Sequence, residues 1–118
     1  MFVIEDQKMY LTKGDSASLT IDLVDAAGLP ESVQTNDVLT LTVRDKPGGN
    51  LIFSAENAVG SNEINITHDM TASQKASVYS ADIQLKRGQD RYTIWPTRPF
   101  DTVGNMGNFV LLPEVTES

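Results

Sequence analysis

Tyr79-Ser80-Ala81-Asp82-Ile83-Gln84-Leu85 carries an apolar or aromatic side chain at every second position, with polar side chains between them. A period of two predicts a β-strand that buries one face and leaves the other in water. The same alternation recurs over Leu19–Leu23 and over Leu39–Val43. No stretch has the sustained period of an amphipathic helix, so these segments indicate an all-β chain.

Turn-forming residues separate the predicted strands. Glycine occurs with Asp, Asn, Ser or Pro in Lys13–Ser16, Asp25–Gly28 and Asp45–Asn50, and Arg87–Asp90 forms a tight connection. Further strands are predicted at Leu51–Phe53, Ile64–Ile66, Arg91–Trp95 and Phe109–Leu112. For the apolar triplet Leu51–Phe53, the sequence does not decide which side chains face the core. Leu29–Ser32 is not predicted to continue a strand, because Pro30 has no amide hydrogen to donate to a neighbouring strand.

The crossover before Tyr79 supplies a second indication of the architecture. Residues 67–74 are the one stretch expected to form a helical turn, with Asp69 as a possible cap. Tyr79 follows it and resembles the tyrosine corner of Greek-key sandwiches, in which the hydroxyl bonds back to upstream backbone. We therefore predict an immunoglobulin-like antiparallel β-sandwich of about seven or eight strands with Greek-key connections. It forms a single domain over residues 1–118, with a polar tail at 114–118.

Composition limits the classes of function. The chain has 118 residues, no cysteine and a net charge of −7, so disulfides, thiol nucleophiles and thiolate metal sites are excluded. An acidic domain of this size repels a phosphate backbone, and we expect no nucleic-acid partner. No apolar run is long enough for a membrane span, and we expect no membrane insertion. The start of the chain has no signal-peptide pattern, so synthesis in the cytoplasm is expected if Met1 is the native start.

Catalytic patterns are not found in the sequence. The single histidine, His68, has no nucleophile elbow to serve, and a surface or capping role is expected for it. The sequence also has scattered carboxylates of the kind that sandwiches carry on solvated faces, namely Glu63, Asp69, Asp82 and the Asp15/Asp22 pair. We therefore expect no enzyme, no catalytic residues, no cofactor and no metal site.

The best candidate for an interaction site begins at Trp95, the last residue of the Arg91–Trp95 strand, and continues into the loop after it. Tryptophan and arginine are enriched where proteins dock, and the loop adds apolar side chains in a turn-like stretch. A second interpretation is that Trp95 closes one end of the core. The candidate interaction residues are Trp95, Arg98, Phe100, Val103 and Met106.

The order of these elements resembles the N-terminal domain of phage upper-baseplate proteins, and the resemblance covers nearly the whole chain. Asp37–Arg44 is similar to the family's "Asp-x-Val-x-Phe-x-Val-Arg" strand, and Tyr79–Leu85 to its "Tyr-x-Tyr-Asp-Ile-x-Leu" strand. The chain departs from the family in its long Pro96–Gly107 segment. The other matching stretches are Lys13–Ile21, Asp25–Pro30, Thr93–Trp95, Asn108–Leu111 and Val115–Thr116.

The resemblance implies a structural component of a phage or prophage tail or baseplate, acting as an assembly or attachment domain in the virion. It implies homo-oligomeric contacts and other tail proteins as partners, and no catalytic residues. An alternative remains open: an immunoglobulin-like binding module of a bacterial surface or carbohydrate-binding protein, in which Trp95–Phe100 contacts sugars.

Overall fold

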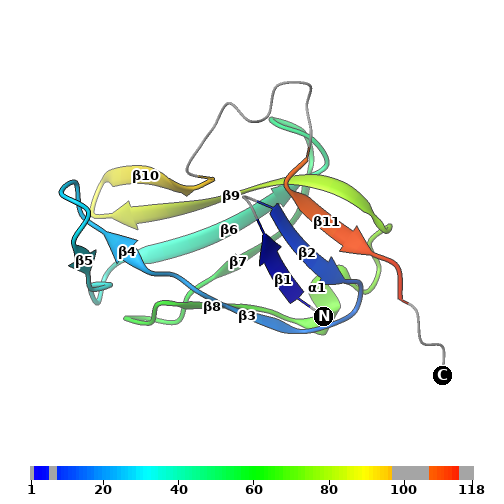
Figure 1. The fold of residues 1–118 in the computed structure, drawn as a ribbon, viewed down its shortest axis with the longest axis horizontal. Coiled ribbons are helices and arrows are strands. Elements are labelled where there is room, and N and C mark those ends of the chain that lie inside the picture. The colour runs from blue at the N-terminus through cyan, green and yellow to red at the C-terminus, as the bar shows by residue number, and fades with distance from the viewer. Residues whose placement is uncertain (1, 6–7, 97–106, 115–118) are drawn as a thin grey trace.

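The computed structural model describes residues 2–5, 8–96 and 107–114 (Figure 1). Within these ranges the chain forms eleven strands and one short helix. In chain order they are β1 (Phe2–Glu5), β2 (Lys8–Thr12), β3 (Ala17–Thr20), β4 (Leu23–Val24), β5 (Pro30–Glu31), β6 (Val38–Arg44), β7 (Leu51–Glu56), β8 (Glu63–Ile66), α1 (His68–Thr71), β9 (Ser77–Arg87), β10 (Asp90–Trp95) and β11 (Phe109–Leu112).

The larger sheet has seven strands in the order β1-β2-β11-β9-β6-β7, and β10 pairs with the same edge of β9 as β11, at the other end of that strand (Figure 1). All of its pairs are antiparallel except β2 and β11, which run parallel with Met9 opposite Phe109. The sheet is therefore mixed, whereas the sequence predicted an antiparallel one. Parallel pairing of two strands this far apart in the chain leaves no local signal.

A second layer consists of the antiparallel pair β3–β8. The short antiparallel pair β4–β5 follows β3 in the chain. The core cluster takes side chains from both layers, including Leu41 and Phe109 of the large sheet and Leu19 and Ile64 of the small one. Two sheets thus cover each other's apolar faces, and the all-β sandwich prediction is confirmed. In the described ranges, no helix has the length and apolar character that a membrane crossing requires.

The central strands explain why the alternating segments form this core. Leu39, Leu41 and Val43 of β6 are fully buried, and the register sets them directly opposite Leu85, Ile83 and Ala81 of β9. Side chains at paired positions share a face of the sheet, so the two rows form one apolar surface. Burying each leucine or isoleucine contributes about 1.5–3 kcal/mol relative to exposure.

Four short strands, β1, β2, β4 and β5, were not predicted as separate elements from the sequence. β1 and β2 form a hairpin that contributes the fully buried Met9 and Leu11. Pro30, expected to break the ladder, pairs with Val24 in the two-residue edge pair β4–β5. A proline is tolerated there because its missing donor does not interrupt an interior ladder. These short strands raise the count above the predicted seven or eight.

The crossover between the layers has the predicted form. The helical turn is present as α1, with Thr67 rather than Asp69 at its N-cap. The Tyr79 hydroxyl donates to the carbonyl oxygen of Lys75, as expected of a tyrosine corner. The buried Thr71 Oγ1 accepts from the Gly14 amide at 2.9 Å, which ties the β2–β3 turn to the crossover.

Candidate functional site

Two different strands pair with the edge of β9 that is opposite β6, each over its own part of β9. β11 pairs with Ser77–Tyr79, and β10 pairs with Ile83–Arg87. Between them the side chain of Asn108 replaces a strand: its Oδ1 accepts from the Ala81 amide at 2.6 Å, and its Nδ2 donates to the Ala81 carbonyl at 2.8 Å. The sheet therefore changes partners at this point, and β10 begins a separate stretch of edge.

The outer edge of β10 has no strand partner among the residues that the structure describes. Its first four residues, 90–93, are all exposed. The register places Arg91 opposite Lys86, and Tyr92 opposite the buried Leu85. Arg91 and Lys86 therefore share the outer face of the sheet, whereas Tyr92 lies on the face that is turned toward the core.

A cleft of about 430 Å³ lies beside this edge, between β3 and β4 of one layer and β9 and β10 of the other. We call it the Trp95 cleft. Its lining residues are apolar except Thr20 and Asp22, and Ile94 and Trp95 bring β10 into its wall. A volume of about 300–1,000 Å³ with a mostly apolar lining is typical of binding clefts.

Two of the described residues that line the Trp95 cleft are apolar and exposed. Ile4 is 45% exposed and Val24 is 61% exposed, and both line the cleft. Tyr92, 50% exposed, lies on the same face of β10 as Trp95, because their partners Leu85 and Ile83 are both buried. Single exposed apolar residues are ordinary, and Ile4 and Val24 leave part of the cleft lining as an apolar surface open to solvent.

Trp95 is the one candidate interaction residue that falls within the described residues. Its half-buried side chain packs against the core cluster and also lines the cleft. The other candidate interaction residues, Arg98, Phe100, Val103 and Met106, lie outside the described residues. Sequence reasoning missed the contributions of Ile4 and Val24 to the site, because β1 and β4 were not recognised as strands.

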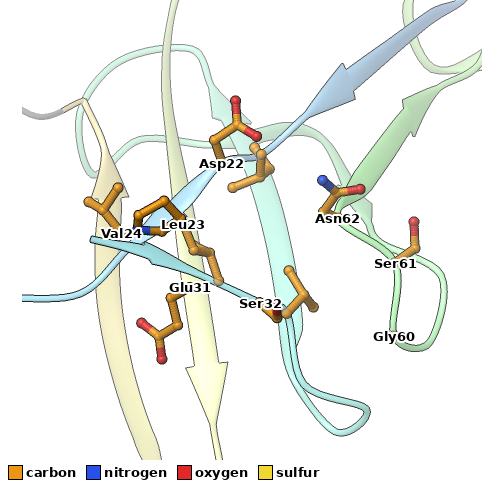
Figure 2. A pocket seen from close by; sticks show the side chains of 11 residues that line it. Asp22, Leu23, Val24, Glu31, Ser32, Gly60, Ser61 and Asn62 are labelled. Atoms are coloured by element: carbon orange, nitrogen blue, oxygen red, sulfur yellow. The ribbon is translucent and has the colours of Figure 1, made fainter. Parts of the chain in front are cut away.

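A second cleft, of about 530 Å³, lies on the other side of β4 (Figure 2). Its polar side chains do not converge, and they come from the residue before β4, from Glu31 of β5 and the residue after it, and from the loop at residues 60–62. In Figure 2 the carboxylates of Asp22 and Glu31 point in opposite directions, away from Asn62. Catalysis by paired acids needs two carboxyl groups that face one substrate, and this pair does not have that arrangement.

Glu31 belongs to an ion cluster that fastens the β5–β6 loop to the end of β9. The Arg87 guanidinium donates to both oxygens of Asp37, at 2.9 and 2.7 Å, and to Glu31 Oε1 at 2.6 Å. Asp37 also accepts from the Gln34 amide at 2.8 Å. The hydrogen bonds from Arg87 hold the pKa of the nearly buried Asp37 carboxyl below its usual value.

His68 and Asp82 lie outside this ion cluster. His68 Nδ1 lies 2.6 Å from the Gly14 carbonyl oxygen, so this exposed ring contacts backbone, in keeping with the surface role predicted for it. Burial raises the pKa of Asp82, on the outer face of the large sheet. Over the ranges that the structure describes, no three His, Asp or Glu side chains gather as metal ligands would.

Comparisons with protein-family models, with curated proteins and with solved structures gave no match to this chain.

Proposed function

We propose that this chain is an attachment domain of a bacteriophage or prophage tail, in the virion baseplate, with immunoglobulin-like Greek-key topology. In this assignment β3 and β8 form the smaller sheet, and β6, β9 and β11 belong to the larger one. The tyrosine corner at Tyr79 supports the topology. The order of the sequence motifs supports the tail assignment.

The observation that carries an attachment role is the apolar mouth of the Trp95 cleft, beside an edge of β10 that no strand of the described residues pairs with. An unpaired edge offers a row of backbone donors and acceptors, and natural proteins usually cover or charge such edges. Here the edge adjoins exposed apolar side chains, which suits contact with another protein. We infer that the domain binds other tail proteins and copies of itself, and that it performs no catalysis.

Removal of residues 98–106 tests the predicted assembly loop. The ends of β10 and β11 pair with Ile83 and Tyr79, which are four positions apart on β9. That separation is about 13 Å, and the residues left between the two strands can span it. We expect the shortened chain to keep its far-ultraviolet circular dichroism and to self-associate more weakly in light scattering. Unchanged association would remove the loop from the proposal.

The tail assignment has an independent test in the gene's neighbours. Flanking genes for tail-fibre, tape-measure or holin proteins are expected. A metabolic operon on both sides would contradict the assignment whatever the behaviour of the loop.

An alternative role is a carbohydrate-binding module, and the position of Trp95 in a cleft favours it to a limited extent. Sugar sites combine an aromatic platform with several hydrogen-bonding groups. The Trp95 cleft has the platform, but Thr20 and Asp22 are its only polar lining residues among those described. A glycan array in which binding is abolished by Trp95→Ala would favour the alternative, and an array without binding would count against it.

A further inference from the structure

We propose that the outer edge of β10 accepts an extended strand from a partner protein, with apolar side chains at every second position and acidic side chains between them. This inference rests on the proposed attachment function and names the surface and the chemistry that it uses. In this mode of recognition, backbone hydrogen bonds provide affinity, and pockets for alternate side chains provide specificity.

The backbone of β10 provides the first requirement. β10 pairs through one edge with β9, and the described residues include no strand on its other edge. β2 occupies the equivalent place beside β11, from Met9 to Thr12. A strand added to β10 would therefore continue the line of β2 and complete the sheet over the second half of β9.

The chain's own first strand is poorly suited to that place. In the β1–β2 hairpin, Phe2 and Ile4 lie opposite the buried Leu11 and Met9, on the core side. If the hairpin opened and β2 were extended backwards, the alternation set by Met9 and Leu11 would turn Ile4 and Phe2 away from the core. Exposure of these apolar side chains opposes the exchange, so an outside strand is required.

The inner face of the edge fixes one half of the partner's pattern. Tyr92 and Trp95 lie on this face, and the cleft beside them has an apolar lining with Ile4 and Val24 exposed at its mouth. Side chains of an added strand that point inward would enter this cleft. They must be apolar, because a charged group buried there would have little to pair with.

The outer face fixes the other half. Lys86 and Arg91 are like charges placed directly opposite each other, an arrangement that destabilises a sheet. Both are exposed, and neither forms an ion pair within the described part of the chain, whereas the neighbouring Arg87 is held by Asp37 and Glu31. An acidic side chain on an added strand would lie next to Arg91 and two strand spacings, about 10 Å, from Lys86, and its charge would offset the repulsion between the two cations.

The same charges oppose the use of this edge for self-pairing. An antiparallel pair of β10 strands from two copies would bring two Lys86–Arg91 pairs close together, which adds repulsion. Copies of the chain must therefore meet elsewhere, and this edge is assigned to a different protein.

Peptide binding tests the inference, with Trp95 as the reporter because it is the single tryptophan of the chain. The probes are two blocked synthetic peptides of about seven residues, the length of an ordinary strand, one alternating glutamate with valine and the other lysine with valine. We expect the acidic peptide to shift the emission of Trp95 to shorter wavelength and to bind about tenfold more tightly than the basic one. A version of the acidic peptide with alternate backbone nitrogens methylated should lose binding, because one of its edges can no longer donate.

Charge reversal supplies the matched control. The double variant Lys86→Glu and Arg91→Glu should exchange the preference for the two peptides, whereas Lys75→Glu, an exposed lysine beyond α1, should leave it unchanged. Absence of an emission shift with either peptide at millimolar concentration would overturn the inference. A second result would also overturn the inference: dimerisation of the wild type, without peptide, whose strength differs in the double variant. In that case the edge would be used between copies of the chain. Either result leaves the attachment function open to its own tests by loop deletion and gene neighbours.

Discussion

The side-chain amide of Asn108 fills the gap between β10 and β11 on the edge of β9. It is buried, and both of its polar groups pair with Ala81, the position that β10 and β11 leave uncovered. Asn108→Ala would leave the Ala81 amide and carbonyl without partners at a site closed to water. Each unsatisfied buried group costs about 1–3 kcal/mol, so we expect a loss of about 2–4 kcal/mol in the free energy of unfolding, measured in urea.

Asn65 provides the matched control for that measurement. Its side chain accepts from Ser18 on an exposed surface, so Asn65→Ala should change the free energy of unfolding by less than about 0.5 kcal/mol. Equal losses in the two variants would show that Asn108 contributes no more than a surface amide does.

Asp37 gives the fold a defined dependence on acid. Its pKa is lowered in the folded state, chiefly by the hydrogen bonds from Arg87, so the carboxylate stabilises the fold at every pH above its unfolded pKa, near 3.8. That stabilisation is lost as the pH falls through the lowered folded value. Asp37→Asn should therefore unfold more readily than wild type at pH 7, and the difference should shrink below about pH 3.8.

The pKa of Asp82 is shifted in the opposite direction from that of Asp37, so Asp82 serves as the comparison. Burial raises its folded pKa, so its ionisation opposes folding at neutral pH and ceases to do so once the pH falls below the unfolded value. Asp82→Asn should be at least as stable as wild type at pH 7, with the two curves converging in acid. A pH-independent loss in Asp37→Asn would contradict the role given to the Arg87 hydrogen bonds.

At the scale of elements, the sequence predicted the strands whose alternation reflects burial on one face. β6, β9 and the β9–β10 hairpin follow directly from Leu39–Val43, Tyr79–Leu85 and Arg87–Asp90. β1 and β2 were missed because their signal, Met9 and Leu11 opposite Ile4 and Phe2, emerges only when the two segments are paired. The cleft could not be predicted for the same reason, since its walls come from strands that are distant in sequence.

The tyrosine corner is the element-scale feature that sequence and structure share, and its energetic role can be measured. Tyr79→Phe keeps the buried ring and removes the hydroxyl that donates to Lys75. We expect a loss of about 0.5–1.5 kcal/mol in the free energy of unfolding, the net value of one hydrogen bond. Tyr10→Phe, on a ring for which no hydroxyl partner is found among the described residues, should be nearly neutral. A larger loss at Tyr10 would remove the corner from the account of stability.

At the scale of the whole molecule, the net charge of −7 and the Lys86–Arg91 pair predict opposite responses to salt. Two copies repel each other as whole acidic bodies, and the repulsion is screened as the Debye length falls from about 30 Å at 0.01 M salt to about 8 Å at 0.15 M. Self-association, followed by light scattering, should therefore strengthen over this range. Docking of the acidic peptide onto the two cations should weaken over the same range, because its attraction is screened in the same way. If both associations weakened with salt, copies would have to meet through complementary charged surfaces, and the assignment of the β10 edge to a partner of another kind would lose its electrostatic basis.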